Sequence, residues 1–101
     1  MSDGDEFGFA PPPFKPDEAM QQLRRTLRSL TGLAERGAQF EWKGRAAVTL
    51  ALGDGHIAAR LAKRAAMQPE WESRTLRNGA EVRRFGDDVK LRLARWRDAD
   101  E

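Results

Sequence analysis

Arginine and lysine are the residues of this sequence with the clearest potential for chemistry. The 101-residue chain has 18 Lys and Arg against 16 Asp and Glu, a net charge of +2. Half of the acidic residues lie in residues 1–19 and 98–101, which leaves the body between them strongly basic. A cationic surface binds phosphate groups, so the body could bind nucleic acid or another polyanion. The alternative is that these are solvated side chains on helix surfaces. The candidate polyanion-binding residues are Arg60, Lys63, Arg64, Arg83, Arg84, Arg92 and Arg95.

Aromatic residues form the second group of candidates. Phe7, Phe9 and Phe14 are spaced through residues 1–15, an acidic segment with three consecutive prolines that we expect to be a disordered tail. Such aromatics either form a short docking motif or pack back onto an apolar patch of their own domain. Phe40 or Trp42, if exposed on a sheet, could stack on nucleic-acid bases.

Catalytic and metal-binding chemistry has little support. His56 is the only histidine, and Asp54 lies close enough in sequence for an acid–base pair, but a lone histidine beside a turn is more typical of a surface position. The chain has no cysteine, and Asp87 and Asp88 are neighbours whose side chains diverge on a helix. We therefore expect no enzyme activity, no cofactor and no metal site.

Neither a membrane span nor a secretion signal is expected. No apolar run approaches the roughly 18 residues that a span requires. The N-terminus carries Asp3, Asp5 and Glu6 where a signal peptide would carry positive charge. The sequence therefore predicts a cytoplasmic protein.

Two amphipathic helices flank the centre of the chain. Residues 16–36 are predicted as the first, with Pro16 at its start, acidic residues in its first turn and Gly37 at its end. Residues 78–97 are predicted as the second, because Asn78 and Glu81 have the spacing of a capping box. Asp88 and Arg92 are at the spacing of a helical ion pair. The apolar stripes are Met20, Leu23, Leu27, Leu30 and Ala34, and Val82, Phe85, Val89, Leu93 and Trp96.

Alternating apolar residues between the helices predict strands over residues 39–42 and 45–52, joined by a turn at Lys43-Gly44. Gly53-Asp54-Gly55 predicts a second hairpin turn, in which both residues of the Asp-Gly step have positive φ. Residues 56–66 fit either a strand or a helix, and we prefer a strand because it would pair with the edge of the preceding one. Residues 68–72 predict a short helical turn, with Trp71 at one end of the core.

The resulting expectation is a single two-layer α+β domain over residues 16–97. It has an N-terminal helix, an antiparallel meander of two or three strands and a C-terminal helix, followed by a frayed acidic end at residues 98–101. We expect both helices to lie on one face of the sheet. The expected core consists of Leu23, Leu27, Leu30, Val48, Leu50, Phe85, Val89, Leu93 and Trp96.

This order of elements resembles that of the double-stranded RNA-binding domain. The resemblance covers element order alone, because the last helix opens N-G-A-E where that family has a Lys-rich K-K-x-A-K motif. The loop histidine motif of that family is also missing. It is therefore an analogy of fold, from which no family membership follows.

The function that we expect is a small non-enzymatic protein-interaction or regulatory module, whose partner is another protein or a second copy in a homodimer. Tryptophan and arginine, both present in the body, are enriched at interface hot spots. The alternative function is binding of nucleic acid through the arginine-rich surface. The response to salt separates the two, since binding to polyanions weakens steeply as salt rises.

Overall fold

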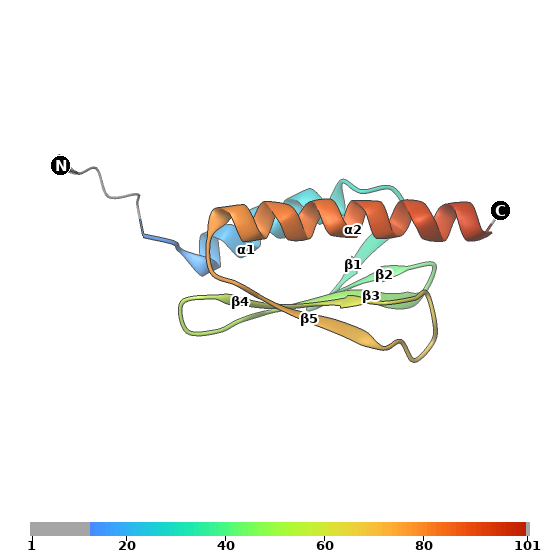
Figure 1. Ribbon diagram of the computed structural model, residues 1–101, viewed down its shortest axis with the longest axis horizontal. Coiled ribbons are helices and arrows are strands. Elements are labelled where there is room, and N and C mark those ends of the chain that lie inside the picture. Colours follow the sequence, from blue (N-terminus) through green and yellow to red (C-terminus); the bar gives the residue numbers. More distant parts are fainter. Residues whose placement is uncertain (1–12, 101) are drawn as a thin grey trace.

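The protein forms two layers, with both helices on one face of a single antiparallel sheet. The computed structural model describes residues 13–100. Helices α1 (Pro16–Arg28) and α2 (Gly79–Asp100) lie side by side over the sheet, and no described element covers the other face (Figure 1). The predicted α+β class and the position of both helices on one face of the sheet are confirmed, whereas the first helix ends at Arg28 rather than at Arg36. The predicted number of strands is wrong, because the sheet has five strands rather than two or three.

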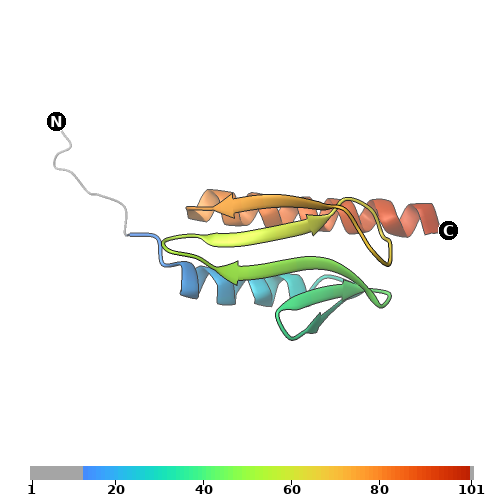
Figure 2. The same cartoon turned by 90° about the horizontal axis from the view of Figure 1, so that it is seen from below.

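The five strands follow one another across the sheet in chain order, as an up-and-down meander (Figure 2). Every neighbouring pair is antiparallel. The predicted strands at 39–42 and 45–52 are confirmed, and the ambiguous third segment is a strand. The strands are β1 (Leu33–Arg36), β2 (Gln39–Trp42), β3 (Arg45–Leu52), β4 (Ile57–Ala62) and β5 (Trp71–Leu76).

Strand β1 replaces the end of the predicted first helix. Helix α1 ends at Arg28, where the amide of Ser29 donates to the Thr26 carbonyl at 3.1 Å and the chain turns. Gly32 then has φ of 90°, and a Cβ there would lie 3.2 Å from the Trp42 indole nitrogen. Only glycine takes this conformation without strain. Gly32 is therefore the residue that redirects the chain into the sheet.

The turns differ in part from the prediction. Lys43 and Gly44 both have positive φ, 52° and 80°, as expected for a tight two-residue hairpin loop. At the next hairpin only Gly55 has positive φ, so Asp54 does not adopt the conformation that we predicted. The amide of Gly53 donates to the His56 carbonyl at 2.9 Å and closes this loop.

Helix α2 begins as predicted and extends through Asp100, beyond Arg97, where we placed the end of the domain. Asn78 Oδ1 accepts a hydrogen bond from the Glu81 amide at 2.9 Å. The Glu81 carboxylate accepts from the Arg77 amide at 2.6 Å, rather than from the Asn78 amide that a full capping box would use.

The core lies between the sheet and the helices. Leu27, Phe40 and Phe85 are among its largest fully buried side chains. Of the predicted core, Leu30 and Trp96 are only partly buried, and they pack against the cluster from its edge. The predicted core residues that are buried are Leu23, Leu27, Val48, Leu50, Phe85, Val89 and Leu93.

Candidate interaction surface

The uncovered face of the sheet carries mostly small side chains. Opposed residues of an antiparallel pair point to the same face, and Ile57, Ala59 and Leu61 of β4 point into the core. The intervening residues of β4 and their partners on β3 and β5 therefore point away from the helices. Over β3 to β5 this open face includes Thr49, Ala51, Ala58, Arg60, Trp71, Ser73 and Thr75.

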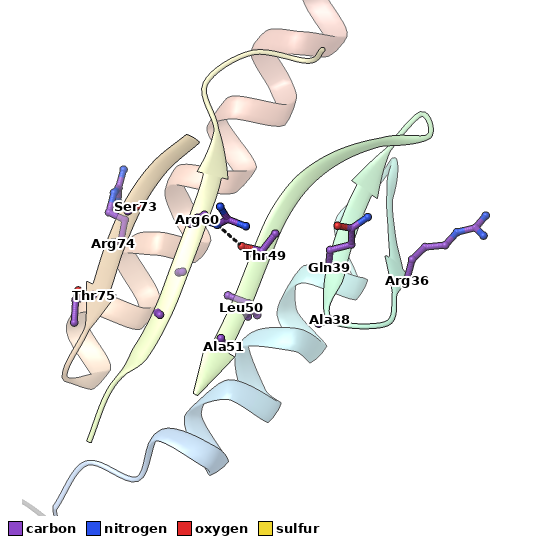
Figure 3. A pocket seen from close by; sticks show the side chains of 12 residues that line it. Arg36, Ala38, Gln39, Thr49, Leu50, Ala51, Arg60, Ser73, Arg74 and Thr75 are labelled. Carbon is purple, nitrogen blue, oxygen red and sulfur yellow. Dashed lines mark hydrogen bonds between the residues drawn. The ribbon is translucent and has the colours of Figure 1, made fainter. Parts of the chain in front are cut away.

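The open face is hollowed near its centre, where alanine, serine and threonine occupy neighbouring strands. The hollow has a volume of about 580 Å³ and is lined by residues from β1 to β5. Arg60 lies across it, donating from Nε to Thr49 Oγ1 at 3.0 Å, as Figure 3 shows. The Arg60 guanidinium carbon also lies 4.8 Å from the ring centre of Trp71. Over β3 and β4 the floor of this hollow is therefore uncharged apart from Arg60, and Arg36 of β1 also belongs to its lining.

The outer edge of β5 presents main-chain groups that no described strand pairs with. The Lys63 amide donates to the Glu70 carbonyl at 2.8 Å, which makes positions 63 and 70 a hydrogen-bonded pair. Because such pairs alternate along an antiparallel ladder, Glu72, Arg74 and Leu76 also direct their main-chain groups toward β4. Trp71, Ser73 and Thr75 consequently direct their N–H and C=O groups outward.

The side chains on the other face of β5 are tied to helix α2. Arg74 donates to Asp88 at 2.6 Å, and its guanidinium lies 5.9 Å from the ring centre of Phe85. Arg92 donates to Glu72 at 2.8 Å and to the Ala62 carbonyl at 2.9 Å. The ion pair that we predicted between Asp88 and Arg92 is thus replaced by two pairs to β5. These contacts hold the edge strand against the helix layer.

The opposite edge of the sheet is less accessible to a partner. Strand β1 has only four residues, and its first amide, on Leu33, donates back to the Leu30 carbonyl at 3.2 Å. Glu35 of β1 accepts hydrogen bonds from Arg28 at 2.7 Å and Arg24 at 3.0 Å. The Arg28 guanidinium, with Arg24 beside it, holds the pKa of Glu35 below its ordinary value. Short edge strands resist pairing, so β5 is the more available edge.

A second hollow lies where the β2–β3 turn approaches the end of α2. Trp42 and Trp96 meet there with ring centres 5.4 Å apart, and only Trp96 keeps part of its surface exposed. The volume of this hollow is about 310 Å³, and its other lining residues are Arg45, Arg64, Ala65 and Ala99. Within residues 13–99, no carboxylate forms an ion pair with Arg45 or Arg64. Both guanidinium groups are therefore available to an anion.

The predicted polyanion-binding residues do not converge on one surface. Arg60 lies on the open face, whereas Arg83 lines a groove between the two helices in the other layer. Arg92 is largely buried, with 17% of its side chain exposed, and is already paired with Glu72. Lys63 and Arg64 lie exposed in the loop after β4, and Arg84 and Arg95 are exposed on α2.

The tail phenylalanines and His56 are the other residues that the sequence singled out. Phe14 is partly buried and packs against the core. Phe7 and Phe9 lie outside the described residues. His56 Nδ1 lies 3.0 Å from the main-chain carbonyl of Asp54 rather than from its carboxylate. Across residues 13–99, no group of three or more His, Cys, Asp or Glu side chains is arranged to hold a metal ion.

The edge strand β5 carries no strong strand signal in the sequence. The helical turn predicted over residues 68–72, from Pro69 followed by acidic residues, is wrong, because Trp71 begins strand β5. Glu72 and Arg74 point to the helix layer, where apolar residues would normally mark a strand. The alternation of Trp71, Ser73 and Thr75 with charged residues was the available signal.

No protein-family model, curated protein or solved structure matches this chain. The analogy with the double-stranded RNA-binding domain also loses its basis, because it depended on three strands and the sheet has five. In the described part of the chain, neither helix is long and apolar enough to cross a bilayer.

Proposed function

We propose that this chain is a small non-enzymatic interaction module that binds another polypeptide as an added strand at β5. The observation that carries the proposal is the row of outward main-chain groups at Trp71, Ser73 and Thr75. An exposed sheet edge accepts an extended segment through main-chain hydrogen bonds, while alternate side chains provide specificity. The open face supports this role, since its small residues leave room beside the added strand.

Strand β5 lacks most of the features that prevent pairing at an edge. Natural proteins commonly blunt an edge with lysine, proline, a bulge or inward-pointing charges. Residues 71–76 contain no lysine or proline, the register of β4 with β5 is continuous, and the inward charges of Glu72 and Arg74 are paired with residues of α2. Glu72 and Arg74 face the helix layer rather than the path of an incoming strand. The edge is therefore open to pairing along its length.

Site-specific photo-cross-linking tests this proposal. A benzoylphenylalanine at Thr75, on the outward edge, should give discrete adducts in cells that produce the protein. The matched control places the same residue at Gln21, which is exposed on α1. Adding Ser73→Pro, which removes an outward amide, should abolish the Thr75 adducts. Equal adducts from both positions, or adducts unaffected by Ser73→Pro, would contradict binding at this edge.

Nucleic-acid binding is a second candidate, and one observation favours it. The hollow at Trp96 combines a partly exposed indole with the guanidinium groups of Arg45 and Arg64. Aromatic side chains stack on bases, and arginines contact phosphates. This is a smaller site than the broad arginine surface that the sequence predicts.

A salt-dependent titration tests the second candidate. Labelled single-stranded oligonucleotides should bind at low salt and lose affinity by orders of magnitude between about 50 and 200 mM salt. The double variant Arg45→Gln/Arg64→Gln should weaken binding, whereas Arg83→Gln should not. Absence of binding at low salt would eliminate this candidate.

A further inference from the structure

We infer that the polypeptide bound at β5 is a second copy of this chain, which forms a symmetric dimer through antiparallel pairing of the two β5 strands. The inference rests on the proposed function, because it uses the same edge. Its basis is the charge order along that edge, where Glu72 and Arg74 flank Ser73. An antiparallel partner of identical sequence reverses this order and opposes each charge to its opposite.

Backbone geometry restricts how two copies can pair. The outward groups belong to Trp71, Ser73 and Thr75, so these positions must oppose one another as hydrogen-bonded pairs. One such register centres the two-fold axis on Ser73, with Ser73 opposite its own copy and Trp71 opposite Thr75. Each opposed pair then exchanges two main-chain hydrogen bonds. None of these residues is proline, so every required amide is present.

The charges select this register over its neighbours. Centred on Ser73, Glu72 of each copy opposes Arg74 of the other at a non-hydrogen-bonded position, where side chains come closest. A shift of the axis by one residue toward the N-terminus opposes Glu72 to itself. A shift toward the C-terminus opposes Arg74 to itself. Like charges directly opposite one another destabilise a strand pair, so both shifted registers are disfavoured.

The existing ion pairs leave these two residues available to a partner. Side chains of Glu72 and Arg74 remain 36% and 31% exposed, and within one chain they are 3.9 Å apart. Arg92 and Asp88 hold each from the helix side. The contacts from α2 thus orient both charges before association, which lowers the entropy lost on binding.

The symmetry also determines the shape of the dimer. A two-fold axis between antiparallel edge strands runs perpendicular to the sheet, so the helix layers of both copies lie on the same side. The two open faces then join into one continuous surface. Isologous pairing of this kind is closed, so it ends at two copies and does not propagate into a filament.

Sedimentation of the full chain tests the dimer. Strand pairing alone gives a smaller interface than the standard of about 1,600 Å², so we expect weak association. From about 1 μM to about 1 mM protein, a range suited to weak complexes, the mass should rise from 11.4 kDa toward twice that value. Ser73→Pro should remain at 11.4 kDa, because proline removes only an outward amide and is tolerated at a strand edge. Ser73→Ala keeps the amide and should dimerise as the natural chain does.

Mixing two charge variants tests the register. Glu72→Arg leaves two arginines on its edge, and Arg74→Glu leaves two glutamates, so each variant alone opposes like charges. We expect dimerisation of each to weaken about tenfold or more. An equimolar mixture restores both opposite-charge pairs and should recover the mass of a dimer. Circular dichroism checks that each variant is folded. If either is unfolded, the comparison of Ser73→Pro with Ser73→Ala decides whether the dimer forms through the β5 edge.

The outcomes separate this inference from the proposed function. A natural chain that remains monomeric at the highest concentration, or a Ser73→Pro variant that dimerises normally, would overturn the inference. A mixture of folded charge variants that stays monomeric would overturn the register. If the Thr75 cross-linker captures a different polypeptide while the chain stays monomeric, the inference fails and the proposed function stands. If it captures nothing that depends on Ser73, both fail.

Discussion

The contact between Arg92 and Glu72 should contribute measurably to stability, although the sequence places Arg92 among residues that could bind polyanions. Arg92 is 17% exposed and makes two hydrogen bonds, of 2.8 Å to Glu72 and 2.9 Å to the Ala62 carbonyl. Arg92→Met keeps most of the aliphatic stem and removes both bonds. A hydrogen bond to a charged group contributes about 1.5–3 kcal/mol, whereas exposed ion pairs contribute about 0–1 kcal/mol.

Because the side chain of Glu72 is 36% exposed, water screens this contact, and we reduce the contribution expected for a hydrogen bond to a charged group. Arg92→Met should lower the free energy of unfolding by about 1–2 kcal/mol. A double-mutant cycle with Glu72→Gln should give a coupling energy of about 0.5–1.5 kcal/mol. Urea unfolding followed by tryptophan fluorescence measures all four free energies. A coupling energy indistinguishable from zero would refute the reasoning and return Arg92 to the set of free cations.

Three further predictions concern the core, a helix glycine and a carboxylate. Leu27→Ala should lower the free energy of unfolding by about 2–5 kcal/mol in urea titrations, because Leu27 is fully buried, whereas Leu91→Ala, at a residue 61% exposed, should change it by under about 0.5 kcal/mol. Equal effects would contradict the packing. Gly86→Ala should raise the melting temperature and stabilise α2 by about 0.5–1 kcal/mol, since the added Cβ would lie 3.8 Å from the nearest side-chain carbon, an ordinary contact; a lower melting temperature would contradict that spacing. The pKa of Glu35 is lower in the folded protein than its usual 4.5 because of Arg28, so its contribution is present above pH 4.5 and lost as pH falls through the folded value. Glu35→Gln should therefore flatten the loss of thermal stability below pH 4.5, and an unchanged acid profile would exclude that linkage.

The elements that sequence analysis predicted are those with strong local signals. Strands β2 and β3 alternate apolar residues on either side of Lys43-Gly44, a turn that both residues suit. Helix α2 begins at a recognisable cap, where Asn78 accepts a hydrogen bond from the Glu81 amide. In each case the residues that define the element are neighbours in sequence. Local propensity and tertiary structure therefore agree.

The elements that it missed depend on contacts between distant residues. Strand β1 has the sequence L-A-E-R, all good helix formers, and pairing with β2 overrides that propensity. Strand β5 lacks apolar alternation because Glu72 and Arg74 face the core side, and their partners lie on α2, 20 and 14 residues away respectively. A hydrophobic pattern cannot show a strand whose inner face is stabilised by ion pairs.

The candidate site at the β5 edge could not be predicted from the sequence, because it too depends on contacts between distant residues. Which strand lies at an edge depends on the number and order of all the strands, and two of the five were not predicted. The arginines were correctly seen as abundant, but only the fold shows that Arg92 is largely buried in an ion pair while Arg60 lies on the open face. Charge composition alone therefore does not indicate where in the fold each arginine lies.

Residue-resolved amide exchange at two protein concentrations tests the central claim most directly, that the outward edge of β5 is a site of strand pairing. The amides of Ser73 and Thr75 should exchange rapidly in dilute protein and become protected in concentrated protein. The amides of Arg74 and Leu76, already bonded to β4, should be protected in both samples. Protection that appears at Ser73 and Thr75 with concentration would support pairing at this edge. Rapid exchange of these two amides at every protein concentration would contradict self-pairing. Rapid exchange of the same amides in a complex with a polypeptide that the Thr75 cross-linker has captured would contradict strand addition altogether.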